Sequence, residues 1–286
     1  MRDQDELRSF LQNDCPSVWS LLSRKAQASL PNGLVEYIGE GTCQEIDRGR
    51  CLVQGVEHKL LALVDSCGWK AVKDAYRRSF SGADTADQVA ELFCEIALCA
   101  HIAALSAQLT IRPPTGKGTT SDFSFVRKGS TLVVYGECKR YEDPWPRCGG
   151  PTARSLGLHP KECLPPGTAR PRSMDLRSKL CDAHRQLPDD TPNILFIFHR
   201  SFGETEVYMV QALFGDANFR PANGYCLQND SLFALPEWRN ISLCCLVSVM
   251  ENQEVGFLRR WENPNACLKT PPEVLQMLEA PGTIAG

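Results

Sequence analysis

Two carboxylates and a lysine lie close together between residues 120 and 144, within two segments that have strand character. Asp122 begins the first segment, in which polar and apolar residues alternate. The second segment is rich in β-branched residues until it reaches Glu137, Cys138 and Lys139. Because side chains alternate along a strand, we expect Glu137 and Lys139 on one face and Cys138 on the other. Carboxylate oxygens are the ligands that Mg²⁺ prefers, so the pattern predicts a metal site beside a lysine.

A short polar segment, residues 127–130, predicts a tight turn between these two strands. Antiparallel pairing around this turn places Asp122 opposite Tyr135 and one diagonal step from Glu137. The charged side chains should therefore gather at the open end of a hairpin. The alternative is a surface salt bridge on an unrelated α/β fold, because such pairs are common on protein surfaces.

A long helix is predicted from Ala86 to about Leu109. Apolar residues occupy nearly all sides of this helix, so it should be buried. Glu91 and Glu95 lie one turn apart on this helix. A carboxylate in such apolar surroundings needs a partner. Two interpretations remain open: solvated or salt-bridged glutamates, or a further carboxylate for the metal site, with Glu95 as the first candidate and Glu91 as the alternative.

The composition indicates a folded globular protein. The chain has 286 residues, 43% hydrophobic and 23% charged, with a net charge of −3. Its first residues are too charged for a secretory signal and no apolar run is expected to cross a bilayer, so we expect a cytoplasmic protein without membrane contact. The 14 cysteines are scattered and include no CxxC pair, so we expect them to act as small apolar residues.

The segment 139–185 differs in charge from the rest of the chain. It has ten Lys and Arg against five Asp and Glu. Within it, residues 144–172 are rich in proline and glycine and show no periodicity, as in long loops that are functional or disordered. We expect this basic insertion to contact a polyanion. The alternative is a disordered surface segment with incidental charge.

The remaining elements suggest a sheet that continues beyond the hairpin. The apolar spacing predicts a helix at 173–187, strands at 193–199, 241–250 and 254–261, a helix in preference to a strand at 204–214, and a short helix near 273–278. A helix between two strands indicates a crossover connection. We therefore predict an α/β fold with a central mixed sheet flanked by helices. The predicted parts are an N-terminal helical region (1–84), the core (85–258) and a C-terminal tail (259–286).

This order of elements resembles the PD-(D/E)xK nuclease superfamily, which has the restriction-endonuclease-like fold. The resemblance covers roughly Ala86 to Met250 and rests on the glutamate-bearing helix followed by SDFSF, VVYGECK, KLCDAHRQL and NILFIF. Ser121 stands where the motif has proline. The resemblance implies a nuclease that uses Mg²⁺, with Mn²⁺ as a substitute, and cleaves DNA in preference to RNA. The alternative is an inactive nuclease-like module that binds nucleic acid or a partner protein.

The resemblance also implies a role for each site residue. Asp122, Glu137 and Glu95 would hold the metal together with the backbone carbonyl of Cys138. Lys139 would orient the attacking water or stabilise developing negative charge. Weaker candidates for contact with nucleic acid are Lys117, Arg140, Lys179 and Gln186. The helical region shows no chemical motif, and we expect it to bind a partner protein or to self-associate.

Overall fold

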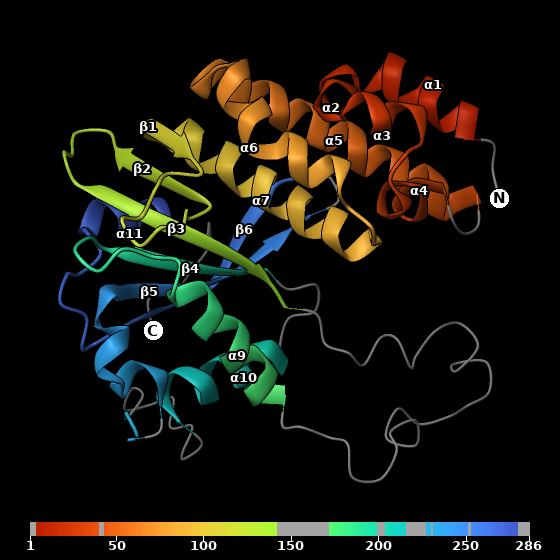
Figure 1. Ribbon diagram of the computed structural model, residues 1–286. Coiled ribbons are helices and arrows are strands. Elements are labelled where there is room, and N and C mark those ends of the chain that lie inside the picture. Colours follow the sequence, from red (N-terminus) through yellow and green to blue (C-terminus); the bar gives the residue numbers. More distant parts are fainter. Residues whose placement is uncertain are drawn as a thin grey trace, which may run out of the picture.

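The protein is an α/β structure in which a helical region precedes a six-stranded mixed sheet with helices, as predicted (Figure 1). The computed structural model describes residues 4–39, 43–141, 172–198, 204–215, 227–229, 231–250 and 253–279. The predicted basic insertion therefore lies almost wholly outside the described residues.

The described residues of the helical region form six helices. They are α1 (Gln4–Asp14), α2 (Pro16–Leu21), α3 (Arg24–Ala28), α4 (Asn32–Gly39), α5 (Cys43–Cys67) and α6 (Trp69–Ser81). Gly68 separates α5 from α6 and has a φ of +82°, which favours glycine. The buried carboxylate of Glu57 in α5 accepts hydrogen bonds from the backbone N–H groups of Ser17 and Val18, both at 2.9 Å. Glu57 thus satisfies the start of α2, which is a structural role.

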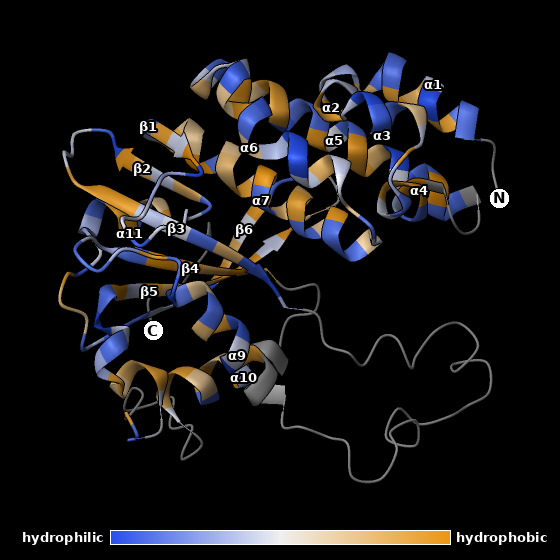
Figure 2. Cartoon of the chain, viewed as in Figure 1, coloured by the Kyte–Doolittle hydropathy of each residue, from blue (hydrophilic) through white to orange (hydrophobic). Residues whose placement is uncertain are grey.

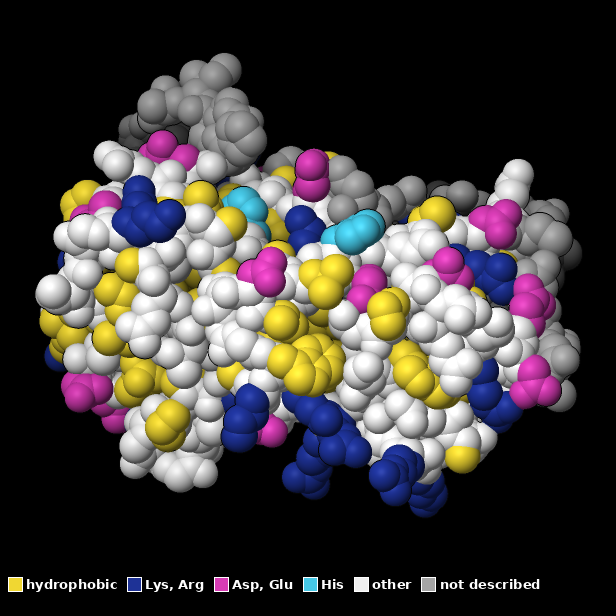
Figure 3. Space-filling model, turned by 90° about the horizontal axis from the view of Figure 1, so that it is seen from above, with side chains coloured by type: hydrophobic (Ala, Val, Ile, Leu, Met, Phe, Trp, Pro, Cys, Tyr) yellow, Lys and Arg dark blue, Asp and Glu magenta, His cyan; other side chains and the backbone are white. Residues whose placement is uncertain are grey.

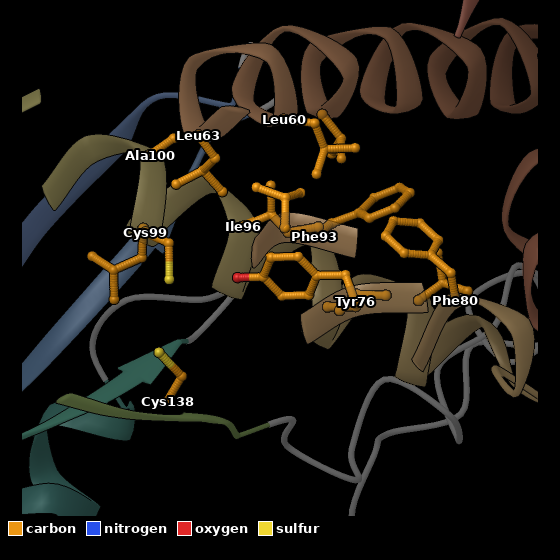
Figure 4. Packing of buried hydrophobic residues seen from close by; sticks show 14 of the residues in the cluster. Leu60, Leu63, Tyr76, Phe80, Phe93, Ile96, Cys99, Ala100 and Cys138 are labelled. Atoms are coloured by element: carbon orange, nitrogen blue, oxygen red, sulfur yellow. The ribbon is translucent and has the colours of Figure 1, made fainter. Parts of the chain in front are cut away.

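Helix α7 (Ala86–Leu105) lies between the helical region and the sheet (Figure 1). A capping box between Thr85 and Gln88 fixes its start. Figure 4 shows its apolar side chains, including Phe93 and Ile96, packed among those of α5 and α6. The helix ends four residues earlier than predicted, because the chain from Ser106 onward pairs with the next strand instead.

The expectation about membrane length is wrong for α7. This helix is long and apolar enough to cross a bilayer by length and composition alone. In the fold it is a core helix, and Val89, Phe93, Ile96 and Ile102 are among its buried residues. Its apolar character is explained by burial between two layers of protein.

The sheet has the order β1-β2-β3-β4-β5-β6. Its strands are β1 (Ser106–Ile111), β2 (Phe123–Arg127), β3 (Val133–Arg140), β4 (Asn193–Phe198), β5 (Ile241–Val249) and β6 (Val255–Glu262). Strands β3, β4 and β5 are parallel, whereas the outer pairs are antiparallel. The central strand β4 is apolar after Asn193 and buried along its whole length (Figure 2). Such strands are typical of a sheet that is covered on both faces.

Helices cover both faces of this sheet, as Figure 1 shows. Helix α9 (Arg172–His184) is the predicted crossover between β3 and β4, and α10 (Glu204–Phe214) follows β4. Both pack on the face opposite α7 and share an apolar cluster with that face of the sheet. Two short 3₁₀ helices, η4 (Leu232–Ala234) and η5 (Pro236–Asn240), precede β5, and α11 (Pro272–Met277) lies in the tail. The predicted helix at 204–214 is confirmed.

The hairpin of β2 and β3 forms, but its predicted register is wrong by two residues. Phe123 pairs with Gly136, and the pairing ends at Val126 with Val133. The predicted turn forms, with the Ser130 N–H donating to the Arg127 carbonyl at 3.0 Å, but the connection is longer than predicted because the chain joins β3 only at Val133. If the observed register is extended by one residue, Asp122 lies beside Glu137 rather than beside Tyr135.

Candidate active site

Asp122 and Glu137 interlock at the open end of the hairpin. The backbone N–H of Asp122 donates to Glu137 Oε2 at 3.1 Å, and the N–H of Cys138 donates to Asp122 Oδ2 at 2.7 Å. Both carboxylates are buried, with 4% and 1% of Asp122 and Glu137 exposed. Each strand thus positions the carboxylate of the other, and the predicted pair of acids is brought together.

Gly136 allows the strands to meet closely at this point. The ring of Phe123 lies over Gly136, and a β-carbon there would overlap the ring. Phe123 also packs against Phe196 of β4, with ring centroids 5.6 Å apart. The fully buried ring anchors the start of β2, directly after Asp122.

Lys139 lies on the same face of β3 as Glu137, as predicted. Its Nζ atom lies 2.9 Å from Glu137 Oε1. Cys138 is on the other face, where its side chain points toward Cys99 of α7 (Figure 4). Burial raises the pKa of the Cys138 thiol. The thiol is therefore a protonated core group, and only the backbone of Cys138 is suited to the site.

Arg112 is the central residue that the sequence interpretation missed. It follows β1 with a φ of +53°, and its N–H donates to the carbonyl of Asp122 at 2.9 Å. Its guanidinium pairs with Asp122 Oδ1 and, at 2.9 Å, with Glu95 Oε2. Arg112 therefore links α7 to the hairpin. The need for a partner to Glu95 was the only signal in the sequence, and no spacing rule pointed to Arg112.

The site contains more carboxyl groups than cations. Three carboxylates, of Glu95, Asp122 and Glu137, face the two cations of Arg112 and Lys139. Burial and then the charge of Asp122 raise the pKa of Glu137 to about 7, although Lys139 opposes this shift. Burial and Asp122 likewise raise the pKa of Glu95, against the effect of Arg112. Such shifts are typical of carboxylates that share one site.

The pKa of Lys139 shifts in the direction that keeps it charged. Burial lowers it, but the charges of Glu137 and Asp122 outweigh burial and raise the pKa above its ordinary value. Lys139 is therefore an ammonium ion at neutral pH. It can donate hydrogen bonds and stabilise negative charge, but it is poorly suited to accept a proton.

A pocket of about 270 Å³ opens over these side chains. Besides the charged residues, its lining includes Ser79, Gln88, Glu91, Leu92 and Gln186. Glu91 is half-buried and accepts a long hydrogen bond from the N–H of Arg140 at 3.5 Å. Glu95 is the candidate that Arg112 connects to Asp122, whereas Glu91 lines the same pocket and forms no ion pair with Arg112.

Of the weaker candidates, only Gln186 lines this pocket. Lys117 pairs with Asp189 at 2.6 Å. Lys179 donates to the carbonyl of Arg140 at 2.7 Å and so ties α9 to the end of β3. The side chain of Arg140 donates to the Asp87 carbonyl at 3.1 Å and lies 3.8 Å from the Asp87 carboxylate, at the start of α7. These three cations hold parts of the fold together around the site.

The donor chemistry of the site fits a hard cation, but its arrangement does not form a complete cage. Glu95 Oε1 is buried and is not bound by Arg112, which pairs with Oε2, so this oxygen is where a cation would be stabilised. Among the residues that the structure describes, no three histidine, cysteine or carboxylate side chains are arranged to hold a metal ion. Arg112 occupies one side of both Glu95 and Asp122. A metal ligand role for Glu95 therefore requires Arg112 to move.

The two carboxylates of Asp122 and Glu137 fit Mg²⁺ better than the three predicted carboxylates, which include Glu95. Mg²⁺ is commonly bound through one or two carboxylates, with water filling its other positions. In an extended strand the N–H and C=O of one residue project toward the same edge, so the carbonyl of Cys138 projects on the side of Asp122.

Comparisons of this chain with protein-family models, with curated proteins and with solved structures find no match.

Proposed function

We propose that the protein is a metal-dependent nuclease that hydrolyses phosphodiester bonds in nucleic acid, with DNA preferred over RNA. One observation carries the proposal: the hairpin holds Asp122 and Glu137 together through its own backbone N–H groups and sets Lys139 2.9 Å from Glu137. The order of elements around this hairpin also resembles that of the PD-(D/E)xK nuclease superfamily, which supports the proposal.

Each residue has a chemical role in this proposal. Asp122, Glu137 and the carbonyl of Cys138 would hold Mg²⁺ or Mn²⁺. When bound, the metal lowers the pKa of a bound water and offsets charge on the phosphate. Lys139 is protonated, so it stabilises negative charge that develops on the phosphate oxygens. The amide of Gln186 lies at the same pocket and can orient a water molecule or a phosphate oxygen.

The test is cleavage of supercoiled and linear DNA with Mg²⁺ or Mn²⁺, and with EDTA in place of the metal. We expect Asp122→Asn, Glu137→Gln and Lys139→Met each to lower the rate by about 100-fold or more, because each removes a group that acts on the transition state. Lys128→Ala, in the exposed turn of the hairpin, is the control and should cleave normally. If the wild type cleaves no faster than Asp122→Asn, the proposal is wrong.

Arg112 favours a second candidate function. A guanidinium already pairs with both Glu95 and Asp122, so the same fold could bind nucleic acid without holding a metal. For such a nuclease-like module we expect DNA binding in EDTA, no cleavage, and no change in melting temperature when Mn²⁺ is added. A rise in melting temperature with Mn²⁺ that disappears in Asp122→Asn would favour the nuclease instead.

A further inference from the structure

Helices α3 and α6 form a strongly basic part of the helical region. Together they carry six Lys and Arg against one acid, in a chain whose net charge is −3. The basic residues are Arg24, Lys25, Lys70, Lys73, Arg77 and Arg78, and the acid is Asp74. We call these six residues the α3–α6 basic surface.

The two helices are joined where their charges meet. The backbone N–H of Ser23, the cap of α3, donates to the hydroxyl of Ser81, the last residue of α6, at 2.9 Å. On α6, Val72, Tyr76 and Phe80 are buried in the core. Arg77 and Arg78 are exposed, as are Arg24 and Lys25 of α3, and the hydrogen bond places the start of α3 beside the last turn of α6.

Most of this positive charge is not neutralised by the protein. Considering only the residues that the structure describes, Arg24, Lys25, Lys73, Arg77 and Arg78 form no ion pair. By contrast, Arg8 of α1 binds Asp5, and Arg50 of α5 binds Glu6. Lys70 is the exception within the surface, because it pairs with Asp74 at 2.6 Å. Figure 3, seen from the side of the helical region, shows Lys and Arg side chains gathered along one edge.

The surface reaches the rim of the candidate active site. Ser79 follows Arg78 at the end of α6 and lines the same pocket as Asp122 and Glu137. A polyanion that lies along α6 would therefore meet the pocket at one end of the helix. The clustered charge would also steer it there.

We propose that the α3–α6 basic surface binds the phosphate backbone of nucleic acid and leads it to the pocket of Asp122 and Glu137. The guidance to the pocket rests on the proposed function, whereas the binding itself does not. A lipid surface fits less well, because an interfacial helix inserts an apolar face, and that of α6 is already buried in the protein. None of the large hydrophobic residues exposed in the described parts of the chain belongs to α3 or α6.

The test measures binding of a short fluorescent DNA duplex by anisotropy, in EDTA, over a range of salt concentrations. Each phosphate contact contributes about 0.9 to the slope of log K against log salt. We expect Lys73→Ala, Arg77→Ala and Arg78→Ala each to weaken binding and to lower the slope by about that amount. Lys128→Ala is the matched control, since Lys128 is exposed, lies at the far end of the hairpin and forms no ion pair with a described residue.

The triple variant of Lys73, Arg77 and Arg78 gives the decisive comparison, with its fold checked by circular dichroism. An unchanged slope in the folded triple variant, or an equal loss in Lys128→Ala, overturns the inference. So does a triple variant that loses affinity for anionic vesicles but not for DNA. Weakened DNA binding in the triple variant supports the inference even if the wild type never cleaves, an outcome that removes only the nuclease proposal. Conversely, if the triple variant keeps the metal-dependent cleavage of the wild type unchanged, the inference about the basic surface is wrong but the nuclease proposal stands.

Discussion

The carboxyl group of Glu137 is buried beside Asp122, and these surroundings set the pH at which it loses its proton. Its pKa of about 7 lies well above the ordinary value of 4.5. As pH rises, the unfolded chain therefore releases this proton before the folded protein does. The protonated Glu137 carboxyl therefore stabilises the folded protein fully below about pH 4.5, and this contribution is lost as pH rises through about 7.

We therefore expect the free energy of unfolding to fall between about pH 4.5 and pH 7, by about 3 kcal/mol from Glu137, and to level off above that range. Glu137→Gln should flatten this part of the profile, since an amide does not titrate. Urea unfolding at a series of pH values measures the effect. Asp190→Asn removes an exposed carboxylate and is the control, which should keep the slope of the wild type. Equal slopes in wild type and Glu137→Gln would show that Glu137 does not titrate in this range.

Arg112 is the cation on which two buried carboxylates depend. Removing it by Arg112→Gln leaves Glu95 and Asp122 without their shared partner, and breaking a buried ion pair in this way costs about 3–5 kcal/mol. Lys70→Gln is the comparison, because the pair of Lys70 with Asp74 is exposed and such pairs contribute about 0–1 kcal/mol. Thermal or urea unfolding checks both values. A loss below about 1 kcal/mol for Arg112→Gln would mean that the guanidinium is not the main counter-charge.

The Arg112→Gln variant also tests whether the site binds a metal ion. If Mg²⁺ or Mn²⁺ can take the place of the guanidinium, added Mn²⁺ should raise the melting temperature of Arg112→Gln more than that of the wild type. Adding the substitution Asp122→Asn to Arg112→Gln should abolish this larger rise in melting temperature. An equal response in all three proteins would contradict a metal site at Asp122.

At the scale of single residues, the sequence could indicate the acids and Lys139 but not Arg112. Strand alternation places Glu137 and Lys139 together without any knowledge of the rest of the chain. Arg112 reaches Glu95 from the end of another strand, in a left-handed backbone conformation. Arginine has no spacing signature for such a contact, so only the folded arrangement reveals it.

Among the elements, the hairpin depends on a close contact between Gly136 and Phe123. Gly136→Ala would force the ring to move, and overpacking of this kind costs about 1–3 kcal/mol. Asp122 precedes Phe123 directly, so the change should also disturb the acid pair. We expect Gly136→Ala to be less costly when Phe123→Leu is also present. A double-mutant cycle of unfolding free energies measures this coupling, and a coupling near zero would contradict the contact.

The types of the elements were predictable, whereas the register of the hairpin was not. Apolar periodicity distinguishes the crossover helix α9 from the buried strand β4 without long-range information. The register depends on where the chain joins β3 after the turn, and residues 131–132 lengthen the connection before Val133 pairs with Val126. Turn length cannot be deduced from alternation, because a shift of two residues leaves each side chain on the same face.

In the whole molecule, one apolar cluster runs from the helical region through α7 to the sheet. It contains Leu11 of α1 and Leu60 of α5 together with Phe123 of β2 and Phe196 of β4. The helical region therefore covers α7 and completes the core that supports the candidate site. A helix as apolar as α7 would otherwise expose much of its surface.

This continuity predicts that a change in the helical region is felt in the sheet. Leu60 and Leu61 are neighbours on α5, with 0% and 47% of their surface exposed, and only Leu60 belongs to the cluster. We expect Leu60→Ala to cost about 2–5 kcal/mol because it leaves a cavity beside α7. Leu61→Ala should stay within about 0.5 kcal/mol, because surface substitutions seldom cost more.

The measurement is urea unfolding followed by two probes at once. Circular dichroism reports mainly on the helices. Tryptophan fluorescence, measured in a background with Trp19, Trp69 and Trp145 replaced by Phe, reports on Trp238 and Trp261 on the side of the sheet that faces away from α7. For a single cooperative unit, both probes of Leu60→Ala should shift to lower urea together. If the circular dichroism transition moved alone, the helical region would unfold separately. The packing against α7 would then not link it to the sheet that carries Asp122 and Glu137.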